Sequence, residues 1–538
     1  MALVTQLAHS ASALAPLLLP SIAAIIALAL FQRFFAPNPL SNIPTVGDQE
    51  YPGYEKKRQA YLTGKAKDLY VEGYTKFKHG LFRIVTPNAG NVIVVSPSFL
   101  GELKKLPDDV VSFDAALDDF MHTKYTLIPT HEAVIPHTVK SSLTPSLPRL
   151  NPQISQEVQI AFSQEIAPLI SMSQAASESE WAPININSKL LRIVAKVSGR
   201  IFIGPELCHD ERYLEAAVGY TVSVMEAQRA VEKMNPWLRP FAAWRLPEVK
   251  KLAEMEKDAT AFLRPVVEAR REKQRKGEEE ERDNDMLQWL MDSADQGQGK
   301  AHGKWGEDTT TTRKLARLQL AISFAAIHTT TLVTTHAVYS LAADKGLQDT
   351  LREEVRSVLK EHSDGVFTTS ALQAMKKTDS FLKETMRFHP LGQTSFSRKV
   401  LKTFVLSNGQ VMPKGSTIQV PNYAVSRDPD VYPNPDVFDP LRFYNLRNEA
   451  RGKGEVEQAA TNQFVSVNKE FLTFGYGRHA CPGRFFAANE IKMILANLVM
   501  TYEMGLAEGE TERYRDWDIA AGTIPDPTKN VMFRSLVV

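Results

Sequence analysis

The sequence has few cysteines and almost no net charge, and each of these features argues against one class of protein. Two cysteines occur among 538 residues, which disfavours a disulfide scaffold and suits a reducing compartment. Lysine and arginine number 63 against 62 aspartates and glutamates, for a formal net charge of +1. This balance gives no indication of a nucleic-acid-binding protein. The sequence also lacks internal repeats and low-complexity linkers that would divide it, so one large domain is the simplest organisation.

Motifs for nucleotide binding and for hydrolysis are missing as well. Gly297 and Gly299 are followed by His302 where the dinucleotide-binding pattern GxGxxG needs a third glycine. His131-Glu132 is followed by Ile135 where the zinc motif HExxH needs a histidine. The serine-hydrolase elbow GxSxG does not occur. Zinc and serine hydrolases are therefore disfavoured, and any redox chemistry needs electrons from a separate protein.

One of the two cysteines stands in a loop suited to bind a metal. Residues 474–483 read FGYGRHACPG, and Gly475 and Gly477 permit a backbone that lies close to a planar ligand. Cys481 comes directly before an apolar helical run, whose N-terminal amides would lower the pKa of the thiol and stabilise a thiolate. These features predict haem iron bound by Cys481. Cys208, in an apolar stretch, fits the commoner case of a small buried residue.

This segment resembles the cysteine loop of the cytochrome P450 family. The family pattern FxxGxRxCxG is matched at Phe474, Gly477, Arg478, Cys481 and Gly483. The resemblance implies a cytochrome P450 fold, mainly α with small β-sheets, and a haem b with Cys481 as the metal ligand. The guanidinium of Arg478 suits a haem propionate in two-point geometry. The residues expected to contact the haem are Cys481, Arg478, Arg398, Phe474, Gly475, Gly483, Lys140 and His137.

Three charged residues are predicted to form a structural network around the haem. Glu384 and Arg387 are three residues apart, so they share a helix face and can pair. Such pairs are usually exposed, but this one precedes a segment, Phe438–Phe443, that resembles the PERF motif of the family. Arg442 is the arginine of that motif, with Leu441 where the family has an acidic residue. The resemblance implies that Arg442 joins Glu384 and Arg387.

A long helix is predicted from Arg313 to Ala343, a stretch without proline or glycine. Its centre holds three successive threonines, which weaken or bend a helix, so a kinked buried helix is one interpretation. By resemblance, the family motif [AG]Gx[DE]T aligns with residues 325–329. Thr329, with Thr330 beside it, would then deliver protons. His328 replaces the usual acid, and with an ordinary pKa of about 6.5 it either relays protons or is an unremarkable polar residue.

Two further haem contacts rest on resemblance alone. Arg398 lies in a strand-like segment, 397–400, and is expected to reach a propionate. His137 and Lys140 stand where many relatives carry a tryptophan and an arginine, and either could equally be an ordinary polar residue. Other strands are predicted at 92–95, 403–406 and 417–420, with a hairpin turn at Asn408-Gly409.

The N-terminal region predicts a membrane anchor. Residues 11–31 carry no charge over 21 positions, which is enough to span a bilayer. A cleaved signal peptide is the alternative, but no basic region precedes this stretch and no clear cleavage site follows it. Arg33 then favours a cytosolic catalytic domain. We expect residues 1–35 to be a single-pass anchor in the endoplasmic reticulum membrane, 36–50 a proline-containing linker and 51–538 one haem-thiolate catalytic domain.

The substrate side is predicted only in outline. The sequence around His328 is similar to that of fungal members that oxidise diterpenes, indole diterpenes and related secondary metabolites. The expected pocket walls are the segments 121–129 and 393–396, the long helix and residues 523–525. The segment 235–244, with two tryptophans among prolines, is either a loop resting in the membrane interface or a buried interhelical turn.

The sequence therefore predicts a haem-thiolate monooxygenase that uses O2 and NADPH-derived electrons to oxidise a hydrophobic small molecule, such as a terpenoid. NADPH-cytochrome P450 reductase is the expected electron donor, with cytochrome b5 as a second candidate, and nucleic acid is not an expected partner. Two alternatives remain open at this stage. One is a reductase-independent haem-thiolate isomerase, dehydratase or peroxygenase, and the other is a non-catalytic haem-binding protein.

Overall fold

The computed structural model describes residue 20 and residues 40–87, 90–176, 180–235, 237–277, 284–295, 311–362 and 365–536. Apart from residue 20, the predicted membrane anchor lies outside these ranges. Among the described residues one helix, Thr312–Ala342, is long and apolar enough to cross a membrane, but most of its apolar stretch is buried inside the protein. That helix is therefore an element of the core.

Helices form most of the described structure, as predicted. The longer ones are α8 (Thr144–Glu165), α9 (Ala167–Ala176), α10 (Ile186–Phe202), α11 (Glu211–Lys233), α13 (Pro247–Lys276), α14 (Met286–Asp295), α15 (Thr312–Ala342), α16 (Lys345–His362), α18 (Lys376–Phe388), α20 (Arg442–Gly452) and α22 (Arg484–Thr501). The shorter ones are α2 (Tyr54–Ala60), α3 (Ala66–Lys76), α4 (Leu100–Leu103), α5 (Phe113–Met121), α6 (Thr123–Thr126), α7 (Val134–Thr138), α12 (Arg239–Ala242), α17 (Thr369–Ala374), α19 (Asn422–Ser426) and α21 (Val456–Thr461).

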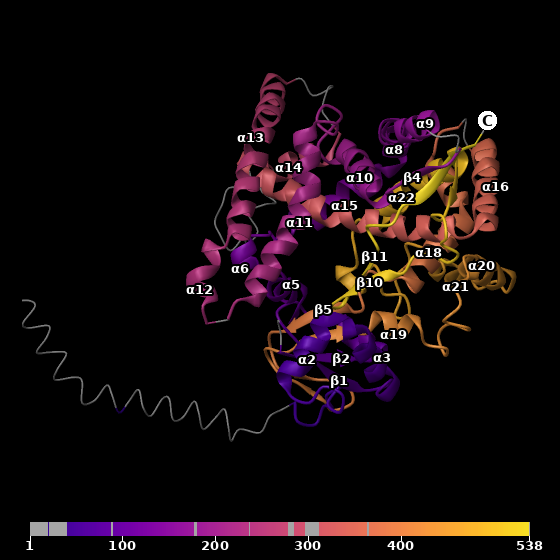
Figure 1. Cartoon of the computed structure of the whole chain (residues 1–538). Coiled ribbons are helices and arrows are strands. Elements are labelled where there is room, and N and C mark those ends of the chain that lie inside the picture. Colours follow the sequence, from indigo (N-terminus) through magenta and orange to yellow (C-terminus); the bar gives the residue numbers. More distant parts are fainter. Residues whose placement is uncertain are drawn as a thin grey trace, which may run out of the picture.

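Helix α15 is the centre of the helical part. It packs against α10, α11, α13 and α22, and Figure 1 shows it running through the middle of the molecule. Its observed bounds differ by one residue at each end from the predicted ones. The start is fixed by Thr311, whose side chain accepts a hydrogen bond from the Lys314 amide as an N-cap.

The strands form four small sheets. A five-stranded sheet has the order β1 (Leu81–Thr86), β2 (Gly90–Val95), β8 (Thr417–Val420), β5 (Ser395–Val400) and β3 (Val111–Ser112). A three-stranded sheet has the order β4 (Ala182–Ile184), β12 (Val531–Ser535) and β9 (Tyr502–Gly505). Two hairpins pair β6 (Phe404–Val405) with β7 (Val411–Met412) and β10 (Asp516–Ile519) with β11 (Gly522–Pro525). The strands predicted at 92–95, 403–406 and 417–420 therefore all exist.

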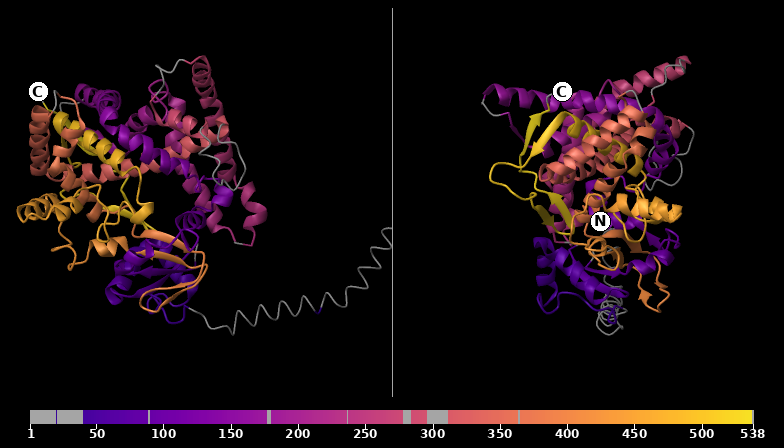
Figure 2. Two further views of the ribbon diagram at one scale, coloured as in Figure 1. Left: turned by 180° about the vertical axis from the view of Figure 1, so that it is seen from behind. Right: turned by 90° about the vertical axis from the view of Figure 1, so that its right-hand side faces the viewer.

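The five-stranded sheet joins parts of the chain that are far apart in sequence. Strand β2 pairs with β8 in parallel, with Val92 opposite Thr417, and β8 pairs antiparallel with β5. In Figures 1 and 2 this sheet, with α2 and α3, lies at one end of the molecule, and the helices α13 and α14 lie toward the other. The predicted turn at Asn408-Gly409 is also present, with Gly409 at φ 82° between β6 and β7.

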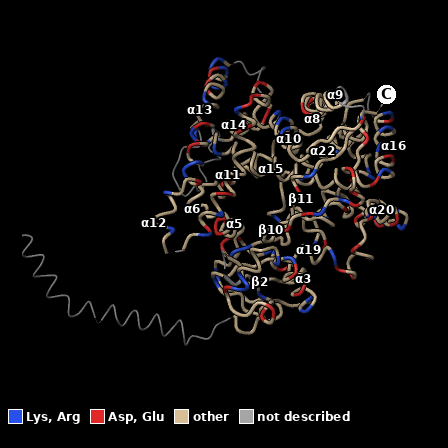
Figure 3. The backbone as a smooth tube through the Cα atoms, viewed as in Figure 1, with Lys and Arg blue, Asp and Glu red and all other residues tan. Residues whose placement is uncertain are grey.

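Charge is mixed over the described elements. Basic and acidic residues are interspersed along the outer helices α13 and α16 (Figure 3).

Candidate active site

The cysteine loop has a backbone that two glycines make possible. Gly475 and Gly477 adopt φ values of 75° and 74°, in the left-handed region that other residues rarely enter. A Cβ at Gly477 would also stand 3.2 Å from the Cβ of Lys104. The loop is closed by the Cys481 amide, which donates to the Phe474 carbonyl at 2.7 Å. Glycine is therefore required at both positions, as the sequence predicted.

Cys481 is exposed at the end of this loop, directly before α22, whose N-cap is Gly483. The backbone amides of Gly483 and Arg484 hydrogen-bond to its sulfur and lower its pKa, but burial outweighs them and raises the pKa above its ordinary value. The prediction of a lowered pKa was wrong for the protein by itself, because the surrounding protein desolvates the thiolate more than the helix terminus stabilises it.

Cys208 provides the contrast. It is fully buried, and burial raises the pKa of its thiol to about 12. This confirms the prediction of a small buried residue. Only Cys481 combines exposure with the N-terminus of a long helix.

Arg398, on β5, is a buried cation without an acidic partner. It is 5 % exposed, and burial lowers its pKa to about 10. Its guanidinium donates to the Ser397 carbonyl at 2.8 Å and lies over the rings of Phe396 and Phe113, at 4.2 and 5.3 Å. No carboxylate of the described residues pairs with it. An unpaired buried charge is costly, so the site suits an incoming anion such as a propionate.

Arg478 differs from Arg398 because the protein already supplies it with an acid. Arg478 is exposed, donates to the Leu106 carbonyl and lies 3.1 Å from Asp108. His479 lies 2.9 Å from the same carboxylate. Asp108 was missed by the sequence reasoning, and no motif could have revealed it, because it is about 370 residues from the loop that it contacts.

Taken together, these residues fit a haem. Cys481 offers a soft sulfur donor, and the glycine-containing loop exposes backbone that a planar group can approach closely. Arg398 offers the unpaired charge that a propionate would satisfy. Phe474 is half-buried in the same loop, with its ring 5.3 Å from that of Phe464 in an edge arrangement.

Glu384, Arg387 and Arg442 lie together in the core. Arg387 on α18 donates two hydrogen bonds to the Glu384 carboxylate, at 2.7 and 2.8 Å. Arg442, at the start of α20, donates to both oxygens of Glu384 at 3.2 Å. Glu384 and Arg387 are completely buried, and Arg442 is 8 % exposed. The geometry is the predicted one, and it fixes α18 to α20.

The remaining donors of this network are used by backbone carbonyls. Arg387 and Arg442 donate to the carbonyls of Ser426, Pro433, Asn434, Pro435 and Val437. Leu441, where the family has an acid, leaves the arrangement intact: its amide donates to Asp439, and the Asp439 amide donates to Glu384. The two guanidinium groups are therefore held by charge and by many directional bonds.

The centre of α15 presents a narrow exposed face inside an otherwise buried helix. Ala325 and Thr329 are exposed, and being four residues apart they lie on one face. The Thr329 hydroxyl donates to the Ala325 carbonyl at 2.8 Å, the back-bonding expected of threonine in a helix. Thr330 is buried, at 3 % exposure. Of the two threonines predicted for catalysis, Thr329 is the accessible one.

His328 points toward another helix. Its Nε2 lies 3.0 Å from the carbonyl oxygen of Val218 on α11, and the side chain is half-buried. Burial lowers its pKa below the ordinary value. The His328 imidazole therefore donates to a backbone carbonyl, which can only accept.

His137 and Lys140 are the least supported of the predicted haem contacts. Both side chains are exposed, on α7 and on the turn that follows it. In the described part of the chain the structure gives neither side chain a hydrogen bond or an ion pair with the cysteine loop. Their assignment as haem contacts stays a prediction.

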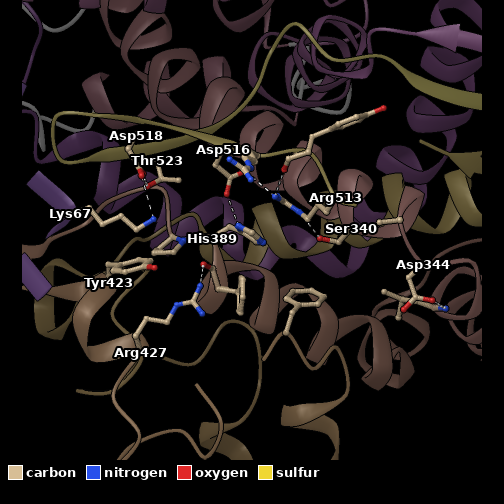
Figure 4. Close-up of a pocket in the computed structure, with 17 residues that line it drawn as sticks. Lys67, Ser340, Asp344, His389, Tyr423, Arg427, Arg513, Asp516, Asp518 and Thr523 are labelled. Atoms are coloured by element: carbon tan, nitrogen blue, oxygen red, sulfur yellow. Dashed lines mark hydrogen bonds and ion pairs between the residues drawn. The ribbon is translucent and has the colours of Figure 1, made fainter. Parts of the chain in front are cut away.

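A pocket of about 490 Å³ lies apart from the cysteine loop. Figure 4 shows Asp516 in it, between His389 and Arg513, with its carboxylate 2.6 Å from His389 Nδ1 and 3.0 Å from Arg513 Nη1. None of the predicted catalytic or haem-binding residues lines this pocket, and of the predicted substrate walls only Thr523 and the C-terminal end of the long helix, at Ser340 and Ala343, contribute to it. Because its charged groups largely pair with one another, we do not place the chemistry there.

Comparisons with known proteins point to the same family as the cysteine loop does. The family model "Cytochrome P450" matches residues 137–530. The chain is 37% identical to cytochrome P450 monooxygenase ATR3 of Stachybotrys chlorohalonatus, over 82% of this chain and 88% of that protein. It is 32% identical to cytochrome P450 monooxygenase 71 of Postia placenta, over 95% of this chain and 96% of that protein. It is also 32% identical to cytochrome P450 monooxygenase paxP of Penicillium paxilli, over 94% and 93%.

The residues matched by the family model include every motif from the long helix to the cysteine loop, and the three relatives align with 82% to 95% of the chain. The chain belongs to the cytochrome P450 family, and it is a monooxygenase of that family.

Proposed function

We propose that this monooxygenase is anchored in the endoplasmic reticulum membrane and hydroxylates or otherwise oxidises a hydrophobic small molecule, a terpenoid or related fungal secondary metabolite, with electrons from NADPH-cytochrome P450 reductase. The observation that carries the proposal is the pairing of an exposed Cys481, on a loop shaped by glycines, with the unpaired buried cation of Arg398. A soft ligand and a buried positive charge are what a haem with propionates requires.

Different residues of the protein would have different roles around the haem. Haem bound through a cysteine thiolate supplies the oxygen-activating chemistry of the family. Cys481 would hold the iron, Arg398 and Arg478 would take the propionates, and the network of Glu384 would keep the supporting helices in place. Cytochrome b5 is a second candidate electron donor.

Thr329 is the residue we assign to proton delivery. Its hydroxyl is on the exposed face of α15, so it can accept a hydrogen bond from water or substrate while donating to the Ala325 carbonyl. Thr330, buried in the same turn, serves as a natural comparison. A valine at Thr329 keeps the shape and removes the hydroxyl.

The hydrophobic nature of the substrate is supported by what surrounds Thr329. Ala325 is the other exposed residue of that face, and Phe324 and Ala326 beside it pack on the apolar core. A site with few polar groups binds an apolar molecule, because polar substrate atoms would lose hydrogen bonds with water there. The terpenoid class itself rests on the resemblance around His328.

The membrane location is supported by a group of exposed apolar side chains around α12. Trp237 is 86 % exposed and Phe241 75 %, and Leu238 and Trp244 are exposed beside them. Such a group is unusual on a protein surface surrounded by water. Tryptophans in this setting favour the membrane interface, so of the two interpretations of residues 235–244 we adopt the interfacial one.

The test is turnover in microsomes that carry this protein and a P450 reductase, supplied with a panel of fungal terpenoids. We expect a hydroxylated or further oxidised product that requires both NADPH and O2. Thr329→Val should lower the product formed per NADPH several-fold, and Thr330→Val should change it little. Turnover that needs no reductase would favour an isomerase, dehydratase or peroxygenase. Haem binding without turnover on any substrate would favour a carrier.

A further inference from the structure

We infer that His328 is a positioning residue: it ties the centre of α15 to α11, and so limits how readily α11 moves and ligands reach the site. The inference rests on the proposed function only in placing the substrate beside Thr329 and Cys481. The unusual histidine of this motif can donate a hydrogen bond to a carbonyl of α11, whereas an ionised acid at the same position could not.

The hydrogen bond defines the state of the imidazole. Val218 offers a carbonyl oxygen, which can only accept, so the proton of the 3.0 Å contact must be on Nε2 of His328. A carbonyl cannot take that proton away. A relay through this nitrogen would therefore need the His328 side chain to leave Val218 first.

The geometry of the helix separates His328 from the exposed face. Successive residues of an α-helix are turned by about 100°, so His328 cannot share the direction of Thr329. Thr329 lies on the exposed face with Ala325, whereas His328 is half-buried against α11. Thr329 and His328 therefore lie on different faces of α15, and His328 is the one that hydrogen-bonds to α11.

The rest of the contact between these helices is mainly apolar. Helices α11 and α15 pack against each other, and the buried side of α11 carries Leu214, Ala217, Val224 and Ala227 together with a few polar residues such as Thr221 and Gln228. Apolar contacts are not directional and allow sliding, while a hydrogen bond weakens steeply when its angle or length changes. The His328–Val218 bond is therefore a directional contact that resists sliding of the two helices.

Helix α11 is also in a position to move. One face of α11 is exposed, with Glu215, Val222 and Glu226, and its other faces pack against α10, α13 and α15. An element with one free face opens at lower free energy than a core element. Losing the His328 bond should therefore affect α11 more than the core.

Two substitutions separate this role from a proton relay. His328→Leu fills similar space but removes the donor. His328→Gln keeps an N–H that can reach the Val218 carbonyl, but an amide does not relay protons at neutral pH. His362→Ala, at the exposed end of α16, is the control for removal of a histidine. All are made in the full-length, haem-loaded protein.

Three measurements give the answer. Stopped-flow absorbance measures the binding and release of imidazole at the haem iron, hydrogen exchange measures the opening of α11, and product per NADPH measures coupling. We expect H328L to speed imidazole binding and release, and the exchange of α11 amides, several-fold, while exchange in α18 and α22 stays unchanged. H328Q should resemble the unsubstituted protein in all three.

Two results would overturn the inference. One is unchanged ligand kinetics and unchanged α11 exchange in H328L. The other is loss of coupling in H328Q with normal ligand kinetics, which would make His328 a relay. If H328L does not fold, H328Q alone decides between the two roles. Hydrogen exchange tests the role of His328 without any turnover. Failure of the proposed monooxygenase function would instead appear as absence of product in the unsubstituted protein.

Discussion

The cysteine side of the site and the α15 side are built from different interactions. On the cysteine side, Glu384 accepts from two buried arginines, and the loop of Cys481 needs glycine at two left-handed positions. On the α15 side, Ala325 and Thr329 form a small exposed face, and His328 supplies a single polar contact to α11. Charged hydrogen bonds demand fixed geometry, whereas apolar packing tolerates exchange of side chains.

This difference matches what each side has to do. A haem is the same molecule in every turnover, so the side that holds it gains from rigid, saturated bonding. A substrate pocket must open, admit a hydrophobic molecule and close, which directional charged bonds would hinder. The comparison predicts that substitutions on the cysteine side cost haem binding and stability, while those on the α15 side alter kinetics.

The largest effect is expected from Cys481→Ala. It should abolish the spectrum of the reduced, carbon monoxide-bound protein that is typical of thiolate ligation, and it should abolish turnover, because no other described residue offers an exposed cysteine sulfur. Absorbance spectroscopy of the purified protein checks this. Cys208→Ala is the matched control, since that thiol is fully buried, and it should keep the spectrum. A normal spectrum in the Cys481 variant would refute the assignment of the ligand.

The next largest effect is expected from Glu384→Gln. Removing the charge leaves Arg387 and Arg442 buried without a counterion. Breaking a buried ion pair in this way lowers the free energy of unfolding by about 3–5 kcal/mol. Denaturant unfolding and the fraction of protein loaded with haem measure the loss. Glu353→Gln is the control, because Glu353 forms the same i, i+3 pair with Arg356 at 3.4 Å on the surface and should cost about 0.5 kcal/mol or less. Similar losses in both variants would contradict the network.

Arg398→Leu should weaken haem retention without unfolding the apoprotein. Loss of a charge-assisted hydrogen bond to a propionate corresponds to about 1.5–3 kcal/mol, which haem transfer to an acceptor protein would reveal as faster release. Arg398→Lys keeps the charge and should recover part of the retention. If the leucine variant holds haem as tightly as the unsubstituted protein, Arg398 does not bind a propionate.

The smallest effect concerns Glu490, a buried carboxyl of α22. Burial raises its pKa from 4.5 to about 8, and the Ser198 hydroxyl at 2.9 Å lowers it less. Between these two pH values the folded protein keeps a proton that the unfolded chain releases, so the free energy of unfolding falls as pH rises. Glu490→Gln removes the ionisable group and with it this slope.

Denaturation midpoints of both proteins, measured across this pH range, provide the check on Glu490. Glu353→Gln should leave the slope as it is, because that side chain is exposed. Equal slopes in the Glu490 variant and the unsubstituted protein would show that the carboxyl is ionised in the folded state.

Sequence motifs located most of the cysteine side. The glycines at 475 and 477 and the helix after Cys481 follow from local rules, and Glu384 pairs with Arg387 within a single helical turn. The bounds of α15 could also be predicted to within one residue, because helix length and capping depend on neighbouring residues. The direction of the Cys481 pKa could not, since it depends on how much of the folded chain surrounds the sulfur.

The sequence by itself determined which functional groups are present: a cysteine ligand, the charged residues that support it and a threonine at the centre of a long helix. Only the tertiary structure decided which groups remain unpaired. Arg478 received Asp108 as a partner, whereas Arg398 has no acidic partner among the described residues. His328 received the carbonyl of Val218. Such pairings join residues more than a hundred positions apart, and they are fixed by packing of the whole chain rather than by any local pattern.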